Sequence, residues 1–463
     1  MSLAAEIARG IEAEVIATGW PVGASLGSEA ALQQRYGVSR SVLREAVRLV
    51  EHHQVARMRR GPGGGLIVTE PDARPATRAV VSYLAYAGTT LDEVLGARRL
   101  LEPLASGLAA EHIDEAGIRS LRALLASDRS GPVHDDIHVV LAELTGNPVL
   151  ALFTDVLSRM TVRYAAAAES GAAAGRRALA AMAADHDDII AAVTAGDRVK
   201  ATTVTSRHLD TVAGLLAGRS PGAPRRTIAP SGAGDKRAET LAATISEDIV
   251  GAGWVPGAVV GAEADLLDRY GVSRSVLREA IRILEFHTVA RMRRGPGGGL
   301  VVTAPEPQAS IDTVALYLEY RRPSREDLQV VRDAIEIDAV ATVAAGVAAG
   351  DLVLPALGPG TVASAVHTAA HDPQHTDAAE ANFHTGMAEL AGNSVLTLFL
   401  RILVELFRRH WAAQGDQPVP GPEDAAQVDL AHAKILEAVV AGDDGLARHR
   451  SRRHLEALSS WWL

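Results

Sequence analysis

One eleven-residue stretch occurs twice in this chain of 463 residues, and this repeat constrains the fold more than any other feature. The letters YGVSRSVLREA run from Tyr36 to Ala46 and again from Tyr270 to Ala280, 234 residues later. Of the 31 residues that begin at Tyr36, 26 are identical to their counterparts. Such self-similarity indicates that one structural unit is present twice. We therefore expect two equal surfaces, which would suit a target with two equal halves.

Arginines are concentrated in the repeated segments, although the chain as a whole is acidic. The net charge is -10, yet the stretch from Arg35 to Leu66 contains seven arginines against two acids, and the stretch from Arg269 to Leu300 has the same counts. Local charge governs contact with phosphates, so an acidic total does not exclude a nucleic-acid partner. The chain also exceeds the usual size of a single core, and two to four domains are expected.

The composition also bounds the compartment and the fold class. The chain has no cysteine, which excludes disulfides and thiolate metal sites and fits a reducing compartment. Charges interrupt the N-terminal segment, and no later stretch reaches about 18 uninterrupted apolar residues, so neither a signal peptide nor a membrane partner is expected. Abundant alanine and only 4% aromatic residues favour a mainly α fold in the cytoplasm.

The start of each half has the pattern of three helices. The first helices are expected over Leu3 to Thr18 and over Ala238 to Ala252. Ser28 is expected to cap a short second helix that ends before Gly37, whereas the second copy has Ala262 at the cap position and therefore no side-chain acceptor. Two short helices joined by a glycine turn are typical of a helix-turn-helix.

The third helix is expected to begin after Ser39, or after Ser273 in the second copy, and to continue to Val50 or Leu284. Its apolar face is expected to consist of Val42, Ala46, Leu49 and Val50. The opposite face carries the arginines. Two strands should follow, Val55 to Met58 and Leu66 to Thr69, and the glycine-rich turn between them is loaded with arginine. Such a hairpin beside a helix-turn-helix would be a wing.

The rest of each half consists of long alanine-rich stretches without a convincing strand. Helices are expected over Leu91 to Glu111, Ile137 to Leu144, Ala173 to Ala195 and Lys200 to Leu216. The expected fold class is mainly α, with two winged helix-turn-helix domains (1–72 and 237–306) and two all-α helical bundles (73–217 and 307–463). A linker rich in proline, glycine and serine is expected over 218–236. The second bundle is 12 residues longer, near Asp351 to Asp377.

These features together resemble the GntR family of transcription regulators. Ser28-Glu29, the repeated YGVSRSVLREA stretch and the glycine-rich hairpin are similar to the winged helix of that family. The pattern Arg98-x-x-x-Glu102 and the pair Gly146-Asn147 resemble the FCD effector domain of its FadR branch. Members usually carry one such unit and form homodimers. The resemblance therefore implies a nucleoid-associated regulator, not an enzyme, in which one chain is a pseudo-dimer and further dimerisation is left open.

The resemblance assigns DNA contacts to the third helix and the wing. Arginine can form paired hydrogen bonds with guanine in the major groove, and glycine permits close approach to the minor groove. The residues implied are Ser39, Arg40, Ser41, Arg44, Arg59, Arg60, Gly61 and Gly63, with Ser273, Arg274, Ser275, Arg278, Arg293, Arg294, Gly295 and Gly297 in the second copy. The position after Ser28-Glu29 is often basic in the family but is Ala30 here, so one phosphate contact is expected to be missing.

Histidines recur at matching spacings in the two helical regions. The first set is His134, His138, His186 and His208, and the second is Glu380, His384, His432 and His454. Nitrogen and oxygen ligands on facing helices can hold a divalent ion such as zinc, nickel or manganese, one in each bundle. By resemblance these are the FCD metal positions. The family usually has aspartate at the first of them, where this chain has His134 or Glu380, and Asp135 is an alternative first ligand in the first half.

By the same resemblance, Arg98 and Arg332 could meet the carboxylate of a small acid bound at the metal. The alternative is an ordinary salt bridge along the helix to Glu102 or Glu336. The favoured function is a repressor that binds an inverted-repeat operator and is released by such a carboxylate. Two alternatives are a regulator that senses the metal ion itself and a metal-dependent hydrolase, although no dedicated nucleophile motif or positioned general base is evident.

Overall fold

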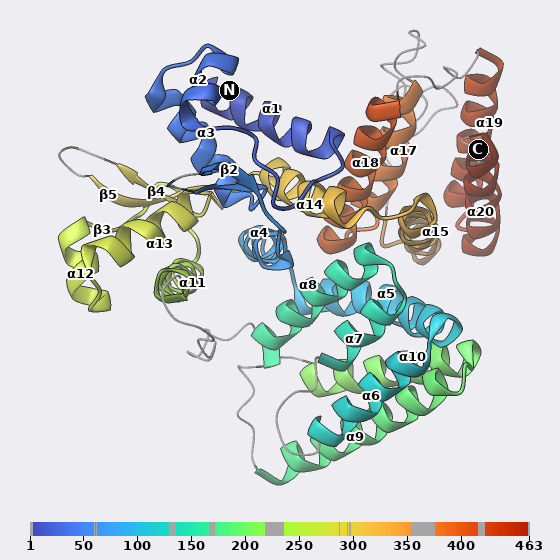
Figure 1. The fold of residues 1–463 in the computed structure, drawn as a ribbon. Coiled ribbons are helices and arrows are strands. Elements are labelled where there is room, and N and C mark those ends of the chain that lie inside the picture. The colour runs from blue at the N-terminus through green and yellow to red at the C-terminus, as the bar shows by residue number, and fades with distance from the viewer. Residues whose placement is uncertain are drawn as a thin grey trace. The chain divides into compact units, whose positions relative to one another are not determined.

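The computed structural model describes residues 3–59, 61, 63–128, 136–165, 172–217, 236–286, 288–293, 295, 298–352, 376–414 and 422–461 (Figure 1). The chain forms two compact units, each built from two separate stretches. One unit comprises Met1–Tyr86 and Arg226–Arg322, and the other comprises Ala87–Arg225 and Pro323–Leu463. We call them the winged-helix unit and the helical unit. Each unit therefore contains a part of both halves of the sequence.

The first copy in the winged-helix unit has three helices and a hairpin. Its elements are α1 (Leu3–Ala17), α2 (Glu29–Tyr36), α3 (Arg40–His52), β1 (Ala56–Arg59) and β2 (Gly65–Val68). The expected caps are present: the Ser28 hydroxyl accepts a hydrogen bond from the Ala31 N–H, and Gly37 ends α2 with a left-handed φ of 63°. The hairpin is antiparallel, with Ala56 opposite Val68. The helix-turn-helix and the wing expected from the sequence are both formed.

The second copy repeats this arrangement with one addition. Its elements are α11 (Lys236–Gly251), β3 (Val259–Gly261), α12 (Glu263–Tyr270), α13 (Arg274–Phe286), β4 (Ala290–Arg293) and β5 (Gly299–Val302). Strand β3 was not predicted; it makes a three-stranded sheet in the order β3-β5-β4, whereas the first copy has only a single bridge, Ser25 to Ile67, at this place. The expected loss of the cap at Ala262 is confirmed, and the Asp265 carboxylate accepts from the Ala262 N–H instead.

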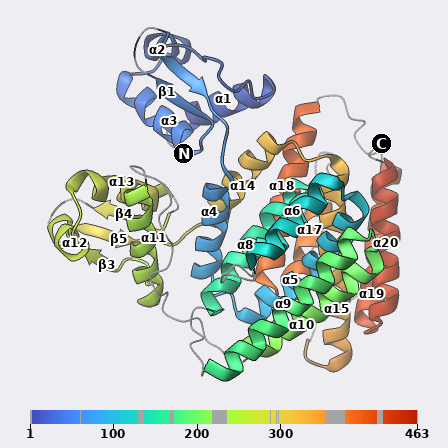
Figure 2. The same cartoon turned by 60° about the horizontal axis from the view of Figure 1, so that its bottom comes forward.

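The helix that follows each winged helix packs against the other copy. These helices are α4 (Ala73–Tyr86) and α14 (Pro307–Arg321), which lie side by side, and the Ser310 hydroxyl donates to the Ala79 carbonyl at 3.1 Å (Figure 2). Tyr320 of α14 places its ring 5.3 Å from Trp20 in the first copy, and Tyr86 of α4 lies 5.5 Å from Trp254 in the second. The two copies are therefore joined by exchanged helices, an arrangement that the sequence pattern does not predict.

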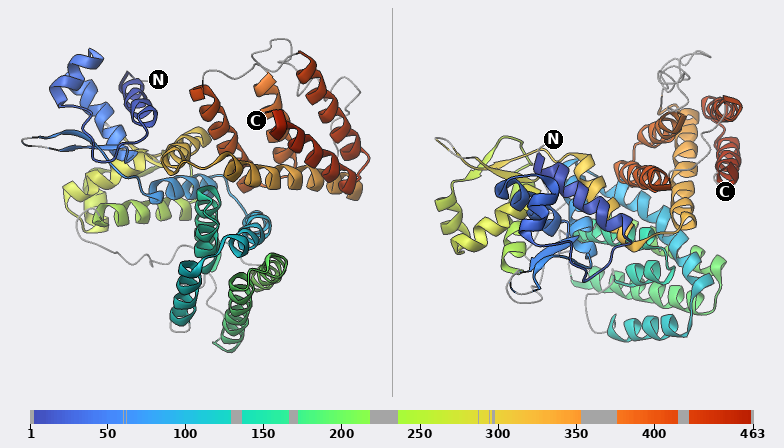
Figure 3. Two further views of the ribbon diagram at one scale, coloured as in Figure 1. Left: turned by 45° about the vertical axis from the view of Figure 1, so that its right-hand side comes forward. Right: turned by 45° about the horizontal axis from the view of Figure 1, so that its top comes forward.

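The helical unit contains two helix groups, one from each half, and no strand within its described residues. The first group is α5 (Leu91–His112), α6 (Glu115–Asp128), α7 (Asp136–Leu144), α8 (Pro148–Ala165), α9 (Ala172–Thr194) and α10 (Arg198–Leu216). The second is α15 (Arg325–Ala349), α17 (Thr376–Leu390), α18 (Ser394–Gln414), α19 (Pro422–Val440) and α20 (Asp444–Trp461). Figure 3 shows the first group in cyan to green and the second in gold to red. Over the described part of the chain, no helix has the length and apolar character needed to cross a membrane.

The two helix groups meet through matched contacts. Phe153 and Phe399 stack with their ring centroids 3.8 Å apart. The amide of Asn147 donates to the Asp327 carbonyl, and the amide of Asn393 donates to the Glu93 carbonyl, both at 2.9 Å. Each asparagine oxygen also accepts from the first N–H groups of the helix that follows it. The Gly-Asn pairs noted in the sequence therefore begin a helix in one group and bond to the other.

Candidate nucleic-acid interface and metal centres

Helix α3 separates a buried face from an arginine face. Leu43, Ala46, Val47 and Val50 are buried, and Val42 and Leu49 are partly buried and pack against the same core, so the predicted face is the packing side and also includes Leu43 and Val47. The Arg40 and Arg44 side chains remain 64% and 55% exposed. Because α13 has the same sequence at all its exposed positions from Arg274 to Arg282, the two copies present the same polar side chains.

A carboxylate on α2 forms ion pairs with Arg40 and Arg44, the arginines of the exposed face of α3 that we call the reading face. The Nε atoms of Arg40 and Arg44 donate to the same Oε1 of Glu29, at 3.0 and 2.7 Å. Hydrogen bonds from Arg40 and then Arg44 lower the pKa of Glu29 from 4.5 to about 2. In the second copy, Glu263 lies 3.4 Å from Arg274 and 3.3 Å from Arg278. This contact of Glu29 with both arginines, which we call the clamp, was not among the sequence-based predictions, although Ser28-Glu29 belongs to the family-like motif.

The serines at the start of α3 form a cap. Ser39 accepts from the Val42 N–H, and its hydroxyl lies 2.9 Å from that of Ser41. Ser273 and Ser275 form the same pair at 3.0 Å. Each serine pair is exposed beside the arginines, at the helix N-terminus where backbone N–H groups favour anions such as phosphate.

The wing presents an arginine and glycines with unusual backbone angles. Arg59 donates to the Gly63 carbonyl at 3.0 Å across the hairpin. Gly61 has a φ of 100° and Gly63 a φ of 68°, which a side chain would strain. In the second copy Arg293 is exposed and Gly295 has a φ of 99°. Arg60, Arg294 and Gly297, for which the family resemblance also implies DNA contact, lie outside the described residues.

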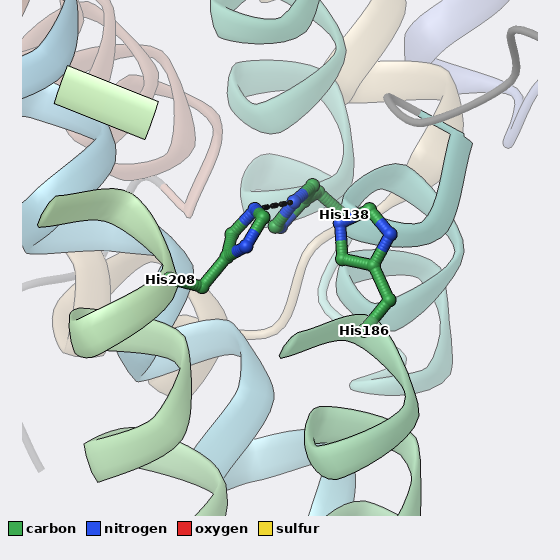
Figure 4. Close-up of side chains that lie close together, drawn as sticks. All are labelled: His138, His186 and His208. Carbon is green, nitrogen blue, oxygen red and sulfur yellow. Dashed lines mark hydrogen bonds between the residues drawn. The ribbon is translucent and has the colours of Figure 1, made fainter. Parts of the chain in front are cut away.

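Three histidines meet inside the first helix group. His138 of α7, His186 of α9 and His208 of α10 are 0–2% exposed, and their ligand nitrogens lie within 4.8 Å of one another. Figure 4 shows the three rings turned toward one another, with the Nε2 atoms of His138 and His208 3.2 Å apart. Three of the four predicted ligands, which are 48 and 22 residues apart in the sequence, are thus brought together by three different helices. His134 lies outside the described residues.

The second helix group contains the same arrangement. His384 of α17, His432 of α19 and His454 of α20 are buried and their ligand nitrogens also lie within 4.8 Å of one another. The Nε2 atoms of His432 and His454 are 3.1 Å apart. Glu380, the predicted fourth ligand, belongs to α17 one turn before His384, but its side chain lies outside the described residues. Both copies therefore bring together three imidazoles from three helices.

A buried carboxylate lies next to one histidine of each cluster, and an arginine donates a hydrogen bond to that carboxylate. Glu102 Oε2 lies 2.9 Å from His138 Nδ1, and Arg98 donates to the other oxygen of Glu102 at 2.5 Å. The second copy repeats this chain: Glu336 lies 3.0 Å from His384 Nδ1, and Arg332 donates to Glu336 at 2.6 Å. The salt bridge left open as an alternative in the sequence is therefore formed in both groups, and the same carboxylate also faces a histidine.

The charges of the first cluster favour metal binding. Burial raises the pKa of Glu102, but Arg98 and His138 outweigh this and hold it at about 2, so the carboxylate is ionised. Burial, followed by the neighbouring histidines, lowers the pKa of His208 to about 2, which keeps this imidazole neutral. Neutral imidazole is the form that binds a metal, and a carboxylate on the far ring nitrogen is the usual support for a metal-bound histidine. The donor set thus fits a divalent ion of the zinc or nickel type.

The chain matches known families along most of its length. The pattern of bacterial regulatory proteins of the gntR family matches residues 3–65 and 237–300, and that of the FCD domain matches residues 93–211 and 327–457. The gntR family is one of bacterial regulatory proteins, in agreement with the prediction of a regulator and not an enzyme.

Individual relatives are more distant. The Uxu operon regulator of Haemophilus influenzae is 27% identical over 146 residues, which is 30% of this chain and 53% of that protein, so the chain aligns with about half of this curated relative. A GntR structure from Streptococcus agalactiae is 21% identical, with a TM-score of 0.33. The match covers 45% of this chain and 98% of the Streptococcus agalactiae chain. The E. coli McbR/YncC structure is 18% identical with a TM-score of 0.24, and the shares are 47% and 97%.

Proposed function

This chain belongs to the GntR family of bacterial regulatory proteins and carries both the gntR and the FCD domain twice, and from this premise we propose that a single chain binds both halves of an inverted-repeat DNA operator. The observation that supports this most strongly is the identity of the two reading faces. Arg40, Arg44 and Glu29 have counterparts in Arg274, Arg278 and Glu263, which form the same two ion pairs at longer distances of 3.4 and 3.3 Å. Identical readers prefer identical half-sites.

Each winged helix would read DNA through two sets of contacts. Arg40 and Arg44 on the exposed face of α3 are suited to guanine in the major groove, and the capping serines are suited to phosphate. The arginines of the wing would follow the backbone or the minor groove. Because both copies belong to one chain, the second binding event is intramolecular, and its effective concentration no longer depends on the concentration of the protein.

The helical unit would sense a small carboxylate. The three histidines of each group would hold a divalent ion, one in each FCD domain, and the ion would supply positive charge for a carboxylate ligand. Arg98 and Arg332, which pair with the carboxylates beside the clusters, would be the other positively charged groups near the ion. We propose that ligand binding alters the placement of the winged helices and so releases a repressor from its operator in the cytoplasm, with a coupling free energy of about 1–3 kcal/mol.

The proposal can be tested by selecting DNA in vitro with the full-length protein. We expect enrichment of an inverted repeat whose two half-sites are the same. Operator binding should then be measured with metal alone and with metal plus candidate acids. Release by the ion alone would favour a metal sensor over a carboxylate-responsive regulator. Failure to enrich any inverted repeat would contradict the proposed function.

The histidine clusters give a direct prediction for metal content. We expect the full chain to retain two zinc ions after dialysis, His186→Ala to retain one, and His186→Ala with His432→Ala to retain none, since loss of one of three ligands should weaken binding by roughly a hundredfold or more. Elemental analysis by mass spectrometry measures this. His449→Ala, at an exposed histidine on α20, serves as the control. Two ions in the double variant would exclude these clusters as the sites.

The clamp on the reading face gives a second prediction. Glu29→Gln should remove the carboxylate that orients Arg40 and Arg44 and add net positive charge at the DNA surface. Non-specific DNA binding should therefore strengthen, and the ratio of operator to non-specific affinity should fall about tenfold. Titrations at several salt concentrations measure both. Glu6→Gln, an equal charge change at an exposed position of α1, should leave the ratio unchanged; an equal effect of both variants would show that only net charge matters.

A further inference from the structure

The helix that packs beside the Arg98–Glu102 pair differs in chemistry between the two helix groups. In α8, Thr154, Ser158 and Thr161 follow one another at helical spacing on one face, and all three are at most 4% exposed. The corresponding positions of α18, aligned through Phe153 and Phe399, are Leu400, Val404 and Phe407. A face of three hydroxyls in one group is therefore entirely apolar in the other.

The hydroxyl face of α8 reaches the buried arginine. Arg98 donates from Nη1 to the Thr161 hydroxyl at 3.0 Å, and Arg98 in turn bonds to Glu102, which faces His138. Thr161 thus links the face to the histidine cluster. Ser158 is one helical turn away from Thr161, and Thr154 is one turn further, so the face extends roughly 10 Å along α8.

Two of these hydroxyls have no hydrogen-bond partner in the described part of the chain. Thr154 is 0% exposed and Ser158 is 4% exposed, and neither Oγ1 of Thr154 nor Oγ of Ser158 finds a donor or an acceptor there. Buried hydroxyls are normally paired, because leaving them unpaired is costly. Unpaired hydroxyls on the same helix face as Thr161, which contacts Arg98, are suited to hydrogen bonds with a ligand that has hydroxyls of its own.

The second group has aromatic side chains around the same arginine. The Arg332 guanidinium lies over the Phe407 ring, 5.3 Å from its centroid. Phe383, which stands where the first group has Ile137, stacks on His432 at 3.9 Å. Leu400 is fully buried. The surroundings of this arginine would favour hydrocarbon over hydroxyl groups, since Leu400, Val404 and Phe407 offer a buried polar group no hydrogen-bond partner.

We propose that the two FCD domains select different carboxylates: the first takes a polyhydroxylated acid and the second takes an acid with an apolar tail. This inference rests on the proposed function, in which each domain binds a carboxylate near its metal. It extends that function because one operator would then respond to two chemically distinct signals. Neither domain alone would account for the response of the chain.

The test uses two acids with the same number of carbon atoms, D-gluconate with five hydroxyls and hexanoate with none. Calorimetric titration of the zinc-loaded full chain is done in the His432→Ala background to report on the first domain and in the His186→Ala background to report on the second. We expect the first domain to bind gluconate at least about tenfold more tightly than hexanoate, and the second domain to show the reverse preference.

Substitutions that give one face the chemistry of the other test whether these residues cause the ligand preference. Ser158→Val in the first domain should remove most of the preference for gluconate, and Val404→Ser in the second should weaken hexanoate binding. Thr203→Val, at an exposed threonine of α10, is the matched control and should change neither. Thermal melts of every variant check that the helical unit remains folded, and the wild-type chain titrated with each acid supplies a reference that needs no substitution.

The outcomes separate this inference from the proposed function. The same preference in both domains, or a preference that Ser158→Val leaves unchanged, would overturn the inference while leaving a carboxylate-responsive regulator intact. Binding of neither acid to either domain would overturn the inference together with the proposed carboxylate response. Operator binding, measured separately, would in that case still test the DNA-binding part of the proposal.

Discussion

Replacing Arg44 and Arg278 together with alanine is expected to abolish operator recognition without unfolding the chain. Each arginine can form a bidentate contact with guanine that contributes about 1–3 kcal/mol, so loss of both should weaken specific binding by roughly 2–6 kcal/mol. The two side chains are 55% and 62% exposed, and exposed substitutions of this kind usually change the free energy of unfolding by less than about 0.5 kcal/mol.

Fluorescence anisotropy with the selected operator measures this effect. The two single variants should lose similar amounts of affinity, because the helices that carry Arg44 and Arg278 have the same reading face. Arg119→Ala, at an exposed arginine of α6, removes the same charge elsewhere and should leave operator affinity nearly unchanged. Unchanged operator binding by the double variant would show that these helices do not read DNA.

The largest effect on stability is expected for Glu102→Gln. This substitution keeps the shape of the side chain but leaves the Arg98 guanidinium, which is 1% exposed, without its counter-charge. Breaking a buried ion pair in this way usually costs about 3–5 kcal/mol in free energy of unfolding. Glu336→Gln should cost less, since the Arg332 side chain is 15% exposed and also lies over the Phe407 ring. Urea denaturation of the metal-free protein measures both.

The pH dependence of stability provides a control for this interpretation. The folded-state pKa of Glu102 is about 2, below its ordinary value of 4.5. Its contribution is therefore fully present above pH 4.5 and is lost as the pH falls toward 2. Between these values the stability of Glu102→Gln should fall less steeply than that of the wild type. Glu115→Gln, at an exposed glutamate, should follow the wild type; a Glu102→Gln chain that matched the wild type throughout would contradict the buried pair.

Local signals in the sequence were sufficient for the helix-turn-helix, the wing and the histidine clusters. Ser39, Gly37 and the apolar spacing determine where α3 begins and which side is buried, and each signal acts within a few residues. The histidine clusters were predictable for another reason: the intervals of 48 and 22 residues recur in both halves. Equal intervals on equal helices imply equal placement, even without knowledge of how the helices pack.

Features that depend on tertiary contacts were not predictable. The clamp of Glu29 on Arg40 and Arg44 needs the approach of α2 to α3, which no spacing reveals. The exchange of α4 and α14 also leaves no local trace, because each helix would have the same apolar pattern whichever copy it contacted. Strand β3 is three residues long and pairs through an irregular register, so its alternation is too short to detect.

The central claim is that one chain presents two equal readers to one inverted-repeat operator, and the stoichiometry of the complex tests it most directly. Native mass spectrometry should be performed on the operator and on a DNA of the same length with one half-site scrambled. We predict one chain on the intact operator, and affinity at least about a hundredfold lower on the scrambled DNA, because only one reader is then engaged. Two chains on each intact operator, or equal affinity for both DNAs, would contradict the account.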